Sequence, residues 1–185
     1  MYPHNLHLQH RPVCCRTTAT IKDSQPVEII LLKSELIHDI EAVITKIERG
    51  RPADAPQLMQ EDVNDSYEMA RHIDTAVNQA VSRCQAYLLL PSPFVQRIAE
   101  NHTHAWEEKS IYLAFPRTWP PHCVGPLRDA VHNYIVYRTA QLFLMLTDEK
   151  AAQQCDLQAM SCWDDINSHL NTRLGATNIY PSFLG

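Results

Sequence analysis

Glycine is scarce in this chain, with only Gly50, Gly125, Gly175 and Gly185 among 185 residues. Loops that hold nucleotide phosphates need closely spaced glycines, because the backbone must approach the phosphate with no Cβ atom in the way. The sequence therefore argues against a P-loop or a Rossmann-type dinucleotide site. The catalytic patterns GxSxG and HExxH and the EF-hand calcium loop do not occur either.

Positive charge and long apolar runs are also lacking. The chain has 16 Lys and Arg against 21 Asp and Glu, a net charge of -5. A general nucleic-acid binder needs a basic face to neutralise phosphates, so this balance argues against one. No run of 18 apolar residues occurs, so we predict no membrane span. The first 20 residues lack an uninterrupted apolar core, so we also expect no secretory signal.

The cysteines form no CxxC pair. Cys84, Cys155 and Cys162 fall inside helical patterns, and Cys123 lies in a proline-rich segment. Only Cys14 and Cys15 are adjacent. Scattered cysteines within helices are typical of a reducing compartment, where they act as small buried hydrophobes, so we favour free thiols over disulfides.

Histidines are the remaining candidates for metal ligands, and their spacing is weak support for a metal. The candidates are His4, His7 and His10 near the start, His102 and His104 around Thr103, and the single Glu35-x-x-His38 pattern. None of these spacings matches a zinc signature. A carboxylate–histidine bundle would need the Glu-x-x-His pattern on two helices. We therefore predict no metal and no cofactor.

A nucleophilic cysteine is the other catalytic alternative. Cys123 could be paired with His122 or His132, but adjacent side chains point apart and no oxyanion hole is evident. His132 lies three residues after Asp129, which is the spacing of a helix-stabilising pair. We predict that the chain has no catalytic residue.

The spacing of apolar residues predicts four helices. They run from Ser34 to Gly50, from about Asp65 to Leu90, from Leu127 to the polar break Thr147-Asp148-Glu149, and from there to Gly175. Ser34 is the expected N-cap of the first helix, and Gly50 its expected end. The third helix is apolar on more than one face, which places it at the centre of a bundle or at an interface.

Two segments between the second and third helices alternate with period two, as β-strands do. These are Phe94–Ala99 and Ser110–Phe115, which predict an inserted β-hairpin over about residues 94–115. The run Val27–Leu32 fits either a strand or the lead into the first helix.

The sequence thus predicts a mainly α fold, a four-helix bundle-like domain with the inserted β-hairpin and extended terminal arms. Residues 1–26 form the N-terminal arm, residues 27–175 the helical domain, and residues 176–185 the C-terminal arm.

Aromatic side chains are the best candidates for protein contacts, because they supply much of the binding energy at interfaces. The candidates are Trp106, Trp119, Tyr134, Phe143, Tyr180 and Phe183. Trp106 is expected in the exposed loop between the two hairpin strands, after the tip formed around Thr103. Trp119, in a proline-rich connector, has the alternative role of a packing anchor.

Four segments in this order resemble small proteins encoded in the head–tail gene clusters of tailed phages and prophages, of the type carried by Bacteroides phages. The segments are VEIILLKSELIHDI, SIYLAFP, LRDAVHNYIVYRTAQLFLMLTDEKAA and DDINSHLNTRLG. The resemblance covers about residues 27–174 and consists of helical patterns, with no catalytic signature.

The resemblance implies a structural virion protein, a head–tail connector or neck adaptor. Such a protein would be assembled in the host cytoplasm and would form a homo-oligomeric ring that bridges portal and tail or other neck proteins. Packaged DNA would move through the ring and contact it only transiently. No membrane would be involved. The resemblance carries over no catalytic residues.

Two other classes remain as alternatives. A small regulatory or DNA-associated helical protein would need a basic helix for the major groove, and no helix here concentrates Lys and Arg. A metal-dependent helical-bundle enzyme would need ligands gathered from several helices.

Overall fold

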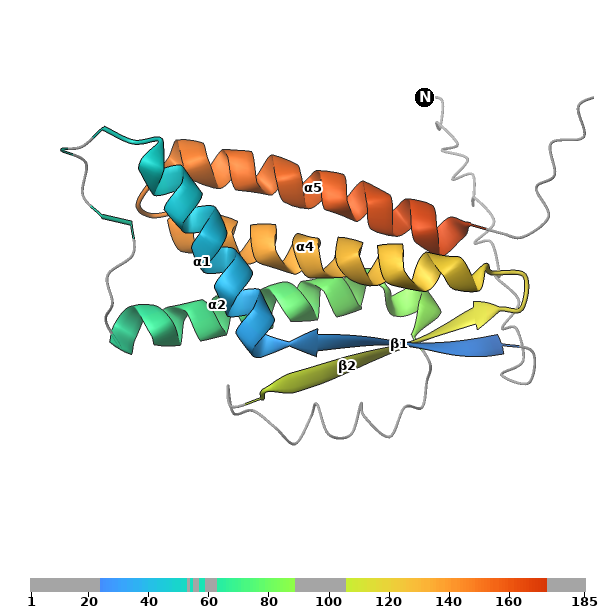
Figure 1. The fold of residues 1–185 in the computed structure, drawn as a ribbon. Coiled ribbons are helices and arrows are strands. Elements are labelled where there is room, and N and C mark those ends of the chain that lie inside the picture. Colours follow the sequence, from blue (N-terminus) through green and yellow to red (C-terminus); the bar gives the residue numbers. More distant parts are fainter. Residues whose placement is uncertain (1–23, 53, 55–56, 59–62, 89–105, 173–185) are drawn as a thin grey trace, which may run out of the picture.

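The computed structural model describes residues 24–52, 54, 57–58, 63–88 and 106–172. In chain order the elements are β1 (Ser24–Leu32), α1 (Lys33–Arg49), α2 (Val63–Arg83), the 3₁₀ helix η2 (Gln85–Tyr87), β2 (Glu108–Pro116), the 3₁₀ helix η3 (Pro121–Cys123), α4 (Val124–Leu144) and α5 (Glu149–Asn171). Four helices pack together beside a two-stranded antiparallel sheet (Figure 1). The predicted mainly α fold is confirmed.

Helix α4 is the centre of the molecule. It lies between α5 and α2, and it also packs against α1 and β1 (Figure 1). Its buried residues spread over more than one face: Leu127, Ala130, Val131, Tyr134, Ile135, Val136, Thr139, Ala140 and Leu144. The central position expected for this helix follows from that distribution of apolar residues.

Helix α5 begins within the predicted polar break, Thr147-Asp148-Glu149. The Asp148 side chain accepts a hydrogen bond from the Ala151 backbone N–H at 3.0 Å, so it caps the N-terminus. The Asp148 backbone N–H in turn donates to the Leu144 carbonyl at 2.8 Å, which makes the connection from α4 tight. Helix α5 ends at Asn171, four residues before the predicted end, and Thr172 after it has an extended backbone.

The sheet pairs two strands that are far apart in sequence. Strand β1 is antiparallel to β2, with Ile29 opposite Ile111. Alternate residues of both strands point into the core, as the period-two pattern predicted for Ser110–Phe115 in β2. The predicted first hairpin strand, residues 94–99, lies outside the described residues, and the partner seen for β2 is β1. Of the two alternatives for Val27–Leu32, the strand is correct, and it begins at Ser24, inside the predicted arm.

Two predicted helix ends are wrong. Ser34 is not the N-cap of α1, because the chain passes directly from β1 into the helix with Leu32 at the cap position. The second predicted helix stops at Arg83, well before Leu90. After Cys84 the chain forms η2 and then becomes extended at Leu88, which bridges Leu113 of β2. This sheet contact ends the helix before the prolines are reached.

Candidate protein-binding surface

Two of the aromatic interface candidates are buried in the chain's own core. Trp119 is 0% exposed; its ring stacks on Phe115 with centroids 4.1 Å apart, and its Nε1–H donates to the His169 carbonyl at 2.8 Å. The alternative role of Trp119, a packing anchor, is therefore confirmed. It ties the connector before α4 to the C-terminal part of α5.

Tyr134 is also buried, with 1% of its surface exposed. Its ring lies 6.2 Å from the Trp163 ring, and the Arg83 guanidinium lies over both rings at 5.3 and 5.0 Å. Burial raises the pKa of the Tyr134 hydroxyl. This cluster joins α2, α4 and α5, so Tyr134 is a core residue and is not available at the surface of the chain.

Trp106, expected in an exposed loop, lies half-buried against its own chain. Its Nε1–H donates to the Asp74 carboxylate at 2.5 Å, and the Lys33 and Lys109 ammonium groups lie 5.7 and 5.5 Å from its ring centre. Phe143 is partly buried and packs on the core. Tyr180 and Phe183 lie outside the described residues.

The residues considered for catalysis do not come together. Cys123 is buried and His122 is exposed. His132 does not pair with Asp129 as predicted, because its Nε2 lies 2.8 Å from the Asp39 carboxylate of α1. The contact between α4 and α1 therefore forms in place of the predicted pair within α4.

The metal candidates are equally dispersed where the structure describes them. Glu35 and His38 lie exposed on α1. His102 and His104, like the N-terminal histidines, lie outside the described residues. Within the described ranges, no three His, Cys, Asp or Glu side chains are grouped so that they could hold a metal ion.

The cysteines of the described ranges are free thiols, as predicted. They are Cys84, Cys123, Cys155 and Cys162. Burial raises the pKa of Cys84 and of Cys155 to about 11, so both thiols are protonated at neutral pH. Such thiols act as apolar packing groups and are poor nucleophiles.

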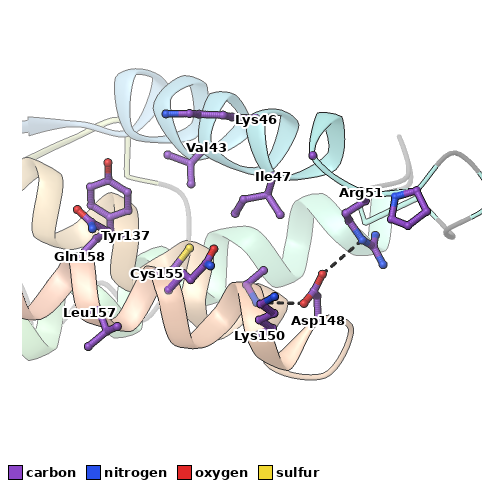
Figure 2. A pocket seen from close by; sticks show the side chains of 14 residues that line it. Val43, Lys46, Ile47, Arg51, Tyr137, Asp148, Lys150, Cys155, Leu157 and Gln158 are labelled. Atoms are coloured by element: carbon purple, nitrogen blue, oxygen red, sulfur yellow. Dashed lines mark hydrogen bonds and ion pairs between the residues drawn. The ribbon is translucent and has the colours of Figure 1, made fainter.

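A groove of about 970 Å³ lies between α1 and α5. Both helices pack on α4, whose Tyr137 contributes to the lining of the groove (Figure 2). Val43 and Ile47 line it from α1, and Cys155 and Leu157 line it from α5. The groove therefore has a mixed apolar and polar lining, in which Gln154 and Gln158 of α5 lie beside the apolar side chains.

Cationic side chains also line the groove. Lys46 of α1, Arg51 after α1 and Lys150 of α5 contribute to the groove, with Asp148 as its carboxylate. Arg51 Nε lies 3.3 Å from the Asp148 carboxylate, and these side chains are only 18% and 21% exposed (Figure 2). This ion pair closes one end of the groove and neutralises Asp148, so positive charge is in excess.

Apolar side chains are also exposed on and beside α5. Leu157 is 69% exposed and Met160 42%, while Met145 and Leu146, at the end of α4, are 53% and 92% exposed. A smaller hollow between α4 and α5 is lined by Met145, Gln153 and Leu157, among others. This surface was not predicted, although Leu157 and Met160 stand out in the sequence as apolar residues on the polar side of α5.

Comparisons with family models, with curated proteins and with solved structures give no match to this chain. None of the helices in the described ranges is long and apolar enough to cross a membrane.

Proposed function

We propose that this chain is a non-enzymatic structural adaptor of a tailed-phage virion. It would act at the head–tail junction, assembled as a ring on the portal and in contact with tail or other neck proteins. The resemblance of four sequence segments to head–tail gene-cluster proteins supports the biological setting. The observation that carries a binding role is the groove between α1 and α5.

The shape of the groove suits a segment of protein chain. Its lining comes from α1, α4 and α5 (Figure 2), and it is open to solvent rather than enclosed. Small-molecule sites are usually concave pockets that enclose most of the ligand's surface. A helix or extended peptide, in contrast, binds by laying an apolar face into an open groove of this kind.

The charges of the groove indicate which kind of chain segment would bind there. Lys46, Arg51 and Lys150 lie around apolar side chains, and only Asp148 opposes them. Complementary charges at the rim favour the correct partner and suppress others. The occupant would be an amphipathic segment of a neighbouring junction protein, with apolar residues at its centre and Asp or Glu at its margins.

The test is binding to the portal ring encoded in the same genome, measured by co-sedimentation. Lys46→Glu reverses a charge at the groove and should weaken binding about tenfold. Arg49→Glu is the matched control, because Arg49 is an exposed cation in the same last turn of α1 but does not line the groove. Its binding should stay within about twofold of the unaltered protein.

A protein that binds no portal ring, or that loses binding equally in both variants, would overturn the proposal. Metal content measured on the same sample tests the metalloenzyme alternative. A stoichiometric metal in a stable monomer would overturn the adaptor role.

A further inference from the structure

The outward side of α5 carries a short heptad pattern that the chain's own core does not use. Its members are Lys150, Gln153, Leu157, Met160 and Asp164, spaced three and four residues apart in turn, and all five are exposed. We call this set the α5 crest. Spacing of three and four is the spacing of residues that face a second helix in a coiled coil. In α5 the residues that face α4 form a different set, Ala151, Ala152, Cys155, Ala159, Ile166 and Leu170.

The charges of the α5 crest are arranged symmetrically about its apolar centre. Lys150 lies seven residues before Leu157, and Asp164 lies seven residues after it. At 1.5 Å per residue, each charge lies about 10 Å from Leu157 along the helix axis. If two such helices run antiparallel and cross at Leu157, Lys150 of each copy comes to the level of Asp164 of the other.

We propose that the α5 crest binds a second copy of this chain, helix to helix and antiparallel. Leu157 of the two copies would meet at the centre, next to Met160, and two Lys150–Asp164 pairs would flank them. A parallel arrangement would instead bring like charges together at both ends, which disfavours it. Self-complementarity of one patch is the requirement for a two-fold symmetric contact.

This contact goes beyond the proposed adaptor function. A two-fold contact closes at two copies, whereas a ring needs a contact between two different patches. The dimer is therefore distinct from the ring, but it shares Lys150 and Leu157 with the lining of the groove. Because one pair of helices buries less surface than a standard interface, the dimer should be weak and in the micromolar range.

The experiment is sedimentation velocity of the full chain over a concentration series, with charge reversals at the two ends of the crest. Lys150→Glu alone and Asp164→Lys alone should each weaken dimerisation about tenfold, because two attractive pairs become two repulsive ones. The double variant restores opposite charges in exchanged positions. Its dimerisation should return to within about threefold of the unaltered protein.

The apolar centre is tested with Leu157→Glu, which should abolish the dimer. Ile30→Glu is the matched control, because Ile30 is 46% exposed on the outer face of the sheet, away from α5, and should leave the dimer unchanged. Circular dichroism spectra would confirm that every variant is folded.

A chain that stays monomeric at several hundred micromolar would overturn the α5 dimer. A dimer that survives Leu157→Glu, or a double variant that fails to recover, would also overturn it. Asp164→Lys separates the two proposals, because Asp164 does not line the groove whereas Lys150 and Leu157 do. Portal binding that persists in a chain that never dimerises would overturn the α5 dimer and leave the adaptor role standing.

Discussion

Helices α4 and α5 are consecutive and of similar length, 21 and 23 residues, but they differ in how they use their surfaces. Helix α4 buries side chains toward α1, α2, α5 and β1. Helix α5 buries one face against α4 and leaves Leu157 and Met160 exposed on the other. The first helix organises the fold, and the second has a face available for a partner.

The difference follows from how apolar residues are distributed around each helix. In α4 they occur at nearly every angle, so no orientation leaves the helix with a polar side, and only a central position buries them all. In α5 small residues such as Ala152 and Ala159 fill the inner face. The spacing of Leu157 along the helix puts it on the opposite side, so it lies outside. Substitutions in the two helices should therefore have very different effects on stability.

The largest expected effect is in α4. Ile135 is 0% exposed, and Ile135→Ala would leave a cavity at the centre of four packed elements. We expect a loss of about 3 kcal/mol in the free energy of unfolding, measured by urea denaturation. Leu146→Ala, at a position that is 92% exposed, is the control and should change stability little. Equal effects at both positions would contradict the central placement of α4.

The next largest effect is expected at the contact that holds the C-terminal part of α5. Trp119→Phe removes the 2.8 Å hydrogen bond to the His169 carbonyl and part of the ring stacked on Phe115. The expected loss is about 2 kcal/mol by thermal or urea unfolding. Hydrogen exchange should also become faster in the last turns of α5. If exchange in those turns were unchanged, the indole would not be what fixes them.

A smaller effect is expected at the start of α5. Asp148→Ala removes the N-cap hydrogen bond to Ala151 and the ion pair with Arg51. The cap should account for about 1 kcal/mol, and the partly exposed ion pair for less. Asp148→Asn is the informative comparison, because asparagine can still cap the helix but cannot form the ion pair. It should recover most of the stability in the same urea experiment.

The smallest effect is expected on the outer side of α5. Leu157→Ala should change the free energy of unfolding by less than about 0.5 kcal/mol when measured on dilute, monomeric protein. The side chain is 69% exposed, so little of its surface is buried by the fold. A loss of more than 1 kcal/mol would mean that Leu157 is part of the chain's own packing, and the contrast between α4 and α5 would fail.

The helix faces were predictable from the sequence because a period of about 3.6 residues is a local signal. Leu36, Ile40 and Ile44 of α1 recur at steps of four residues and are buried. The inward side of β2 was predictable for the same reason, since alternation in Ile111, Leu113 and Phe115 is also local. Local periodicity reports which side of an element is buried.

The pairing of the strands was not predictable in the same way. Alternation shows which side of β2 faces inward but does not identify the strand that pairs with it. Its partner β1 is separated from it in the sequence by two helices.

The burial of the aromatic residues could not be predicted from the sequence either. Trp119 and Tyr134 are as suitable for a core as for an interface, and only the fold shows that both are buried. The groove could not be foreseen because its lining comes from three helices.

The pairing of β1 with β2 has a consequence for the order of folding. Their paired residues are separated by between 76 positions, for Leu32 and Glu108, and 92 positions, for Ser24 and Pro116. Closing a loop of about 80 residues costs roughly 4 kcal/mol in chain entropy, apart from a constant. Helices α4 and α5, in contrast, are joined by a short turn and can meet early. The helical hairpin should therefore be formed in the folding transition state, while the strands join late and their substitutions mainly change the unfolding rate.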